Sequence, residues 1–283
     1  MKRKLDEIFA VTAPGLEEVC ADEIRELVPV EVRVEKGGVG FSGSLETLYR
    51  VNLWSRIASR VVVRVGEVKA RDFPELFKKV KRLPWGRYVR PETPVRVRSS
   101  SRGSRLVHTE RLSTTIADAI DGALGRKTAQ EDCAEQLVIV RMEDDVCRVS
   151  VDSSGELLHR RGYRTESSRA PLRETLAAGM LRLLKWNGNM PLYDPMCGSG
   201  TFIIEGAMIA AGIAPGLQRS FAFQNWPRYR EGLWRNLCDT ARRAEIDVDI
   251  DLNGSDVDPD VIAVARRNAE RAGCGPVVSF EQG

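Results

Sequence analysis

The segment that most restricts the fold of this chain is an apolar stretch that ends in an acid and then turns through two glycines. Residues 191–201 read Pro-Leu-Tyr-Asp-Pro-Met-Cys-Gly-Ser-Gly-Thr, and a helical pattern follows to about residue 211. A buried strand, a tight glycine turn and a helix, in this order, open a doubly wound parallel sheet. A second strand ending at Asp256, a helix over 259–272 and a third strand over 277–280 continue the pattern. The C-terminal part is therefore predicted to be the first half of such a sheet.

The turn after Asp194 favours a ligand that carries both charges. N–H groups at the start of a helix favour an anion, whereas a carboxylate beside them favours a cation. The methionine part of S-adenosylmethionine is a zwitterion and satisfies both. Asp256, at the end of the second strand, can accept hydrogen bonds from ribose hydroxyls. The alternative interpretation of Asp256 is an acidic turn before the helix, although Asp258 is the better candidate for the N-cap.

A nicotinamide dinucleotide fits this turn less well. The G-x-G-x-x-G pattern requires a glycine where Ile203 stands, and its acid follows by about 20 residues, whereas Asp256 lies 56 residues after Gly200. An insertion could explain that spacing, so the spacing weakens the dinucleotide hypothesis without excluding it. A nucleotide-binding P-loop is excluded because the sequence contains no G-x-x-x-x-G-K-[ST] segment.

The N-terminal part alternates short strands and helices, which indicates an α/β layer. Over the first 55 residues the pattern predicts strand 7–12, a helix from Pro14-Gly15 to Leu27, strands 30–34 and 39–41, and a helix capped by Ser44 or Ser42. The elements predicted next are strand 57–68, helix 73–83, strand 94–100, helix 108–124, and strands 136–142 and 146–151. This second group is expected to form a small sheet covered by two helices.

Basic residues are concentrated in one stretch. Between Arg60 and Glu110 there are 14 Lys/Arg and 5 Asp/Glu, a local charge of +9 in a chain whose net charge is +3. Such an excess is expected of a surface that binds a polyanion, although a solvated charged face is the alternative. The candidate RNA contacts are Arg96, Arg98, Arg102 and Arg105, followed by Arg160, Arg161 and Arg164.

Several classes of protein are disfavoured by composition. No stretch approaches 18 consecutive apolar residues and no signal peptide is present, so a soluble cytoplasmic protein without a membrane span is expected. Six scattered cysteines, Cys133 among them, and only two histidines predict reduced thiols and no metal site.

We expect the tryptophans at 85, 226 and 234 to lie in packed interiors rather than to stack on bases. A monomer is favoured.

Beyond the first motif, several segments resemble THUMP-domain RNA methyltransferases. The match comprises His-Arg-Arg-Gly-Tyr-Arg at 159–164, Ala-Pro-Leu-Arg-Glu-Thr-Leu-Ala-Ala at 170–178, Asp-Pro-Met-Cys-Gly-Ser-Gly-Thr at 194–201, Phe-Ala-Phe-Gln-Asn-Trp-Pro at 221–227 and Gly-Ser-Asp-Val-Asp-Pro at 254–259. The chain is most similar to the bacterial 23S rRNA guanine-N2 type. This resemblance implies a ferredoxin-like segment over 1–55, a THUMP RNA-binding domain over 56–155 and a Rossmann-like methyltransferase domain over 165–283.

The resemblance also implies which residues bind S-adenosylmethionine. In the family, the first motif and the acid after the second strand carry this role. A further segment, which lies near the methionine end of the cofactor in the family, adds two weaker candidates. The alternative role of these two residues is helix capping. These positions are Asp194, Pro195, Cys197, Gly198, Ser199, Gly200, Thr201 and Asp256, with Glu174 and Thr175 as the weaker pair.

One family feature is missing from this sequence. Members carry an Asn/Asp-Pro-Pro-Tyr/Phe loop after the fourth strand that holds the reacting amine, and this chain contains no Pro-Pro pair. We therefore assign no catalytic residue and expect a chain that lacks the C-terminal half of its methyltransferase domain. The expected function is methyl transfer to guanine N2 of structured RNA, with 23S rRNA as the first candidate. The alternatives are RNA binding without turnover, a tRNA guanine-N2 methyltransferase, and a DNA adenine enzyme, which the N-terminal module disfavours.

Overall fold

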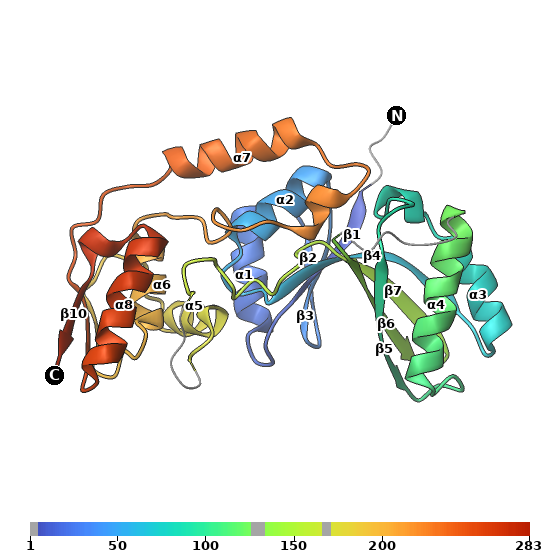
Figure 1. Ribbon diagram of the computed structural model, residues 1–283, viewed down its shortest axis with the longest axis horizontal. Helices are drawn as coiled ribbons and strands as arrows, with labels where there is room; N and C mark the ends of the chain where they lie inside the picture. The colour runs from blue at the N-terminus through green and yellow to red at the C-terminus, as the bar shows by residue number, and fades with distance from the viewer. Residues whose placement is uncertain (1–4, 126–133, 166–170) are drawn as a thin grey trace.

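The N-terminal half of the molecule is built on one continuous sheet (Figure 1). A computed structural model describes residues 5–125, 134–165 and 171–283, so Cys133 and Ala170 lie outside the described residues. Seven strands pair in the order β2-β3-β1-β4-β7-β6-β5. Their bounds are β1 Asp6–Val11, β2 Val32–Glu35, β3 Gly38–Gly43, β4 Arg60–Lys69, β5 Val95–Arg102, β6 Gln136–Glu143 and β7 Val146–Asp152.

Strand β4 joins the two groups of elements that the sequence separated. It pairs antiparallel with β1 on one side and with β7 on the other. The second group was expected to form a small sheet covered by two helices. The helices α3 and α4 are present, but β5, β6 and β7 extend the sheet of the first group instead of forming a small sheet of their own. Hydrophobic periodicity reveals that a strand is half-buried, but it does not reveal which strands pair.

Four helices pack on one face of this sheet. They are α1 Glu17–Leu27, α2 Leu45–Trp54, α3 Phe73–Lys81 and α4 Thr109–Leu124, and Ser44 caps α2 as predicted. The strand register places Ile8, Val63 and Val151 side by side on the helix-covered face, where all three are fully buried. Because side chains alternate along a strand, a second set that includes Arg64, Ser150, Ile139 and Arg98 points the other way; we call this side the open face.

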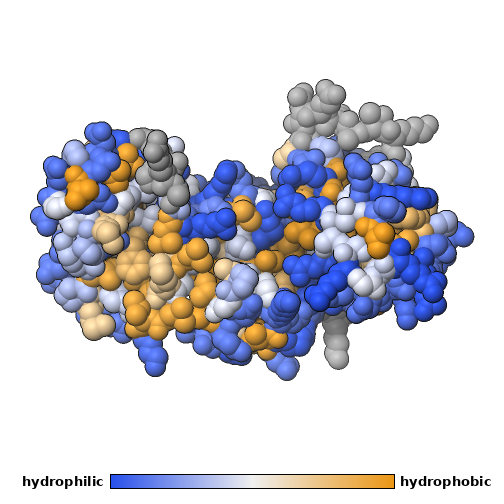
Figure 2. All heavy atoms as spheres, turned by 90° about the horizontal axis from the view of Figure 1, so that it is seen from below, coloured by the Kyte–Doolittle hydropathy of each residue, from blue (hydrophilic) through white to orange (hydrophobic). Residues whose placement is uncertain are grey.

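The C-terminal part forms the predicted start of a doubly wound sheet. Three parallel strands, β8 Leu192–Asp194, β9 Leu252–Asp256 and β10 Ser279–Gln282, lie in the order β10-β9-β8. Helices α5 Glu174–Leu183, α6 Thr201–Ala210 and α8 Pro259–Ala272 accompany them, and Asp258 is the N-cap of α8 as expected. The order of elements predicted from the sequence is confirmed. Figure 2 shows apolar side chains gathered on the underside of this part, and the exposed set includes Met180, Leu183, Leu184 and Met190.

The insertion between α6 and β9 packs on the N-terminal part. It includes α7 Glu231–Arg243, which the sequence analysis did not predict and which contacts α2 (Figure 1). Phe223 stacks on Tyr49 with ring centroids 4.3 Å apart, and Trp226 meets Tyr88 at 5.2 Å. The tryptophans at 85, 226 and 234 are all buried, which confirms their predicted packing role. These aromatic contacts tie the two parts of the chain together.

Candidate cofactor site

The carboxyl ends of β8 and β9 place two acids on either side of the glycine turn. The Asp194 carboxylate accepts a hydrogen bond from the backbone N–H of Met196 at 3.1 Å. The Asp256 carboxylate accepts from the N–H groups of Gly198 at 3.0 Å and Asp258 at 3.1 Å. A carboxylate has about four lone-pair positions, so both acids retain acceptor capacity toward a ligand.

The two glycines of the turn are required for different reasons. Gly198 has φ +53°, and a Cβ placed there would meet nothing within 4 Å. Gly200 has φ +81°, and its Cβ would lie 2.8 Å from the Phe280 ring and 3.1 Å from Ala265. The turn is thus open on the Gly198 side and tightly packed against β10 and α8 on the Gly200 side.

The N–H groups at the start of α6 have no acceptor among the described residues. Gly200 is the N-cap and has no side chain to accept from these N–H groups. The earliest helical bond runs from the Ile204 N–H to the Gly200 carbonyl at 2.9 Å, so the preceding N–H groups lack intrahelical acceptors. Asn268 on α8 fixes the turn by donating to the Ser199 carbonyl at 3.1 Å.

Arg164 links the start of α6 to the start of α5. Its guanidinium donates to the Thr201 hydroxyl, donates to the Leu172 carbonyl at 3.1 Å, and lies 3.5 Å from a Glu174 carboxylate oxygen. Burial raises the pKa of Glu174, with the Arg164 charge acting against it. The second carboxylate oxygen of Glu174 is buried and has no partner among the described residues. Arg164 is therefore a constituent of the corner, and its predicted contact with RNA is not supported.

Arg161 is buried, which overturns its assignment as an RNA contact. Its side chain is 2% exposed and forms an ion pair with fully buried Glu205 of α6 at 3.3 Å. It also donates to the carbonyls of Leu158 at 2.7 Å and Arg56 at 2.8 Å. Glu205 was missed by sequence reasoning, although a single acid inside an apolar helix is a signal that a buried cation faces it.

The remaining candidates of the first motif differ in accessibility. Cys197, Ser199 and Thr201 are almost completely buried, and burial raises the pKa of the Cys197 thiol to about 12. Pro195, in contrast, is exposed. Thr175 is buried behind Glu174 at the start of α5. Sequence reasoning also missed Met196 and Val257, large apolar side chains that are 83% and 77% exposed beside the two acids.

The other predicted RNA contacts are exposed, and only Arg160 shares a cleft with Arg164 and Glu174 of this corner. Arg96, Arg98 and Arg102 are exposed at alternate positions of β5, on the open face. Arg105 is exposed in the turn that follows, and Arg160 is exposed with Glu156 as its partner at 3.0 Å.

Within residues 5–125, 134–165 and 171–283, no group of three or more His, Cys, Asp or Glu side chains could hold a metal ion. No helix in the described part is long and apolar enough to cross a membrane.

Comparisons with known proteins identify the family. Residues 7–62 match the RlmL ferredoxin-like domain, residues 70–152 match the THUMP domain, and residues 161–283 match the RMKL-like methyltransferase domain. A Synechocystis protein named "Putative RNA methyltransferase" is 36% identical over 281 residues, which are 97% of this chain and 73% of the relative. The chain belongs to the THUMP-domain RNA methyltransferase family of the RlmL type.

One further relative and two solved structures are similar to this chain over almost its whole length. The "Ribosomal RNA large subunit methyltransferase K/L" of Psychromonas ingrahamii is 38% identical over 96% of this chain, which spans 38% of that protein. The crystal structure of a protein titled a "putative methyltransferase complexed with SAH" has a TM-score of 0.91 and 36% identity, with 99% of this chain and 76% of that chain covered. A Listeria monocytogenes structure titled a "predicted N6-adenine-specific DNA methylase" also has a TM-score of 0.91, with 35% identity and coverage of 99% and 75%.

Proposed function

We propose that this chain binds S-adenosylmethionine at the β8–β9 corner and acts in methyl transfer to guanine N2 of a structured RNA, with 23S rRNA as the first candidate. The observation that carries the proposal is the combination of two acids, an open Gly198 and unpaired α6 N–H groups at one corner. The relative whose structure contains SAH has the same fold at 36% identity.

The residues present fit each part of the cofactor. The α6 N–H groups suit its carboxylate, and the unpaired Glu174 oxygen and Asp194 suit its ammonium group. Asp256 suits the ribose hydroxyls, and exposed Met196 and Val257 offer apolar surface for the adenine ring. When bound, the cofactor supplies a methyl group on a positively charged sulfur. The protein's part is to orient that group toward an RNA base.

An RNA of the large ribosomal subunit is proposed from the similarity to the "Ribosomal RNA large subunit methyltransferase K/L", of which this chain spans 38%. Guanine N2 is proposed from the motif resemblance to the guanine-N2 type of this family. A tRNA guanine remains the alternative substrate. A second candidate function, RNA binding without turnover, is favoured by the local charge of +9 between Arg60 and Glu110. Incubation with methyl-labelled S-adenosylmethionine and either rRNA or tRNA, followed by nucleoside analysis, separates these options. N2-methylguanosine in rRNA supports the proposal, and a different methylated nucleoside contradicts it.

Cofactor binding is tested by isothermal titration with S-adenosylmethionine. Asp256→Ala removes hydrogen bonds to a charged acceptor, each worth about 1.5–3 kcal/mol, so the affinity should fall by at least about tenfold. Asp256→Asn retains one acceptor oxygen, so its affinity for S-adenosylmethionine should lie between those of Asp256→Ala and wild type. Asp260→Ala removes an equal charge from an exposed position on α8 and is the matched control. Equal affinities for Asp256→Ala and Asp260→Ala would remove Asp256 from the site.

A further inference from the structure

The open face of the seven-stranded sheet carries unpaired arginines. Arg98, Arg102 and Arg141 are exposed, and no hydrogen bond or ion pair of their guanidinium groups occurs among the described residues. Arg141 lies opposite Ser100, between Arg98 and Arg102 of the neighbouring strand. From strand spacing and rise, its Cα is about 8 Å from each of theirs.

The arrangement of these charges does not serve stability. Arg141 stands directly opposite Arg148 across β6 and β7, and like charges at such positions destabilise a sheet. Arg148 is partly neutralised by Glu67, whereas Arg141 has no acid partner in the described part of the chain. Arg102 stands opposite Glu143 across β5 and β6, so the repulsion is confined to Arg141 and Arg148. An arginine pair maintained against this repulsion is suited to an anionic ligand.

A hollow of about 150 Å³ lies beside these arginines on the same face. Phe9, Val62 and Ile139 line it with apolar surface, small Ser150 lines it as well, and Arg141 and Arg148 are at its rim. The Arg64 guanidinium lies over the Phe9 ring at 4.2 Å and is held there by a bidentate pair with Glu35. A small hollow lined by both apolar residues and arginines suits one unstacked nucleobase and its flanking phosphates.

The hollow connects to the cofactor corner through two adjoining depressions. Arg60 and Leu157 line both the hollow and a groove of about 360 Å³, which Arg96 and Arg160 also line. Glu156 and Arg160 in turn line both this groove and a cleft of about 890 Å³ that reaches Arg164 and Glu174. These shared lining residues place the three depressions side by side between the open face and Arg164 and Glu174, and we call this series the path.

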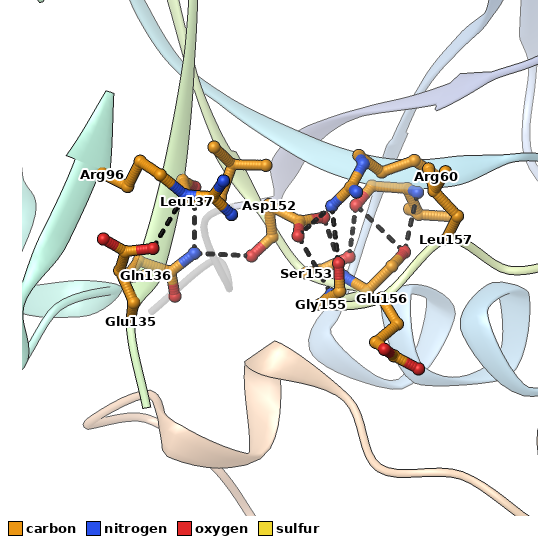
Figure 3. A network of polar contacts seen from close by, with 12 residues as sticks. Arg60, Arg96, Glu135, Gln136, Leu137, Asp152, Ser153, Gly155, Glu156 and Leu157 are labelled. Carbon is orange, nitrogen blue, oxygen red and sulfur yellow. Dashed lines mark hydrogen bonds and ion pairs between the residues drawn. The ribbon is translucent and has the colours of Figure 1, made fainter. Parts of the chain in front are cut away.

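The wall of this path is held rigidly (Figure 3). Arg60 pairs with buried Asp152 and donates to the Gly155 carbonyl at 2.8 Å, which fixes the turn that leads to Leu157. On the β6 side, Arg96 pairs with Glu135 at 2.7 Å, and the Gln136 amide donates to the Asp152 carbonyl at 2.8 Å.

We propose that the open face binds a single-stranded stretch of the RNA substrate, with one unstacked base in the hollow at Ser150 and phosphates on Arg98, Arg102 and Arg141. The path then leads the strand toward the cofactor corner. This inference rests on the proposed function, because it names the surface that positions the RNA for methyl transfer.

The charge part is tested by fluorescence anisotropy of the full chain with a labelled single-stranded RNA of about twelve nucleotides. Removing three phosphate contacts in Arg98→Ala/Arg102→Ala/Arg141→Ala should reduce the slope of log affinity against log salt by about 2. The matched control is Arg50→Ala/Arg235→Ala/Arg243→Ala, three cations on α2 and α7, and it should leave the slope nearly unchanged. An equal reduction in both triple variants, or no binding by wild type, overturns the proposal.

The base hollow is tested by a pair of variants at one position. Ser150→Leu fills the hollow, whereas Ser150→Ala leaves it open, and neither changes the charge. The loss of one base contact predicts at least about fivefold weaker binding for Ser150→Leu at an unchanged salt slope. Wild type should also bind the single strand more tightly than a duplex of the same sequence. Equal affinities of the two Ser150 variants, or equal binding of duplex and single strand, rule out a base in the hollow.

Titration with S-adenosylmethionine separates this proposal from the cofactor site. Variants of the open face should bind the cofactor as wild type does, and Asp256→Ala should bind the RNA as wild type does. Loss of cofactor binding in the open-face variants would show that they act through misfolding and would refute the RNA surface. Unchanged RNA binding in those variants, with normal cofactor binding, would refute the surface alone and leave the proposed function standing.

Discussion

Replacing each glycine of the Gly198–Gly200 turn by alanine should separate stability from cofactor binding. Both residues have positive φ, which costs an alanine about 1–2 kcal/mol. At Gly200 the added methyl group must also displace the Phe280 ring, which its Cβ would approach to 2.8 Å. Overpacking of this kind adds about 1–3 kcal/mol. Gly200→Ala should therefore cost about 3 kcal/mol and Gly198→Ala about 1 kcal/mol.

Hydrogen exchange of peptides covering β8 and α6 measures this difference locally, without requiring the whole chain to unfold in one step. Gly200→Ala should speed exchange there far more than Gly198→Ala. For S-adenosylmethionine binding the order should reverse. Gly198→Ala should lose more affinity, in proportion to its loss of stability, than Gly200→Ala does, because the Gly198 methyl group points into the open corner. If the two variants exchange equally, packing against Phe280 is not what requires glycine at position 200.

Three further predictions concern buried or half-buried groups elsewhere. Arg161→Met should lower the free energy of unfolding by about 3–5 kcal/mol, because it leaves Glu205 unpaired. In urea titrations Arg161→Met/Glu205→Leu should recover part of this loss. No recovery would contradict a stabilising pair of Arg161 and Glu205. Phe223→Ala should cost about 3–5 kcal/mol because its fully buried ring stacks on Tyr49, and a loss under 1 kcal/mol would argue against that contact. Burial, reinforced by nearby arginines, lowers the pKa of His159 to about 4, so stability should fall as the pH drops from about 6.5 toward 4. NMR titration should show the lowered pKa of His159, and His159→Gln should lack this loss of stability. A pKa near 6.5 would refute the prediction.

Much of the local structure could be predicted from the sequence. The apolar spacing in α8 and the Asp258 cap depend only on neighbouring residues, so the predicted helix over 259–272 agrees with the structure. The acid at the end of β8 and the glycines after it are likewise local, and they marked the corner before its geometry was known. What periodicity cannot reveal is the partner of each buried face.

Tertiary structure alone decided how these pieces combine and which charges reach solvent. Arg161 and Arg160 are neighbours with the same charge, yet only Arg161 meets a buried acid, which is 44 residues away in the sequence. The aromatic insertion joined the N-terminal core because its rings found Tyr49 and Tyr88 there. In the same way, the cations of β5 and β6 became one surface only when those strands paired in register. Such contacts form between residues distant in the chain, so their energies favour one arrangement that local sequence patterns do not encode.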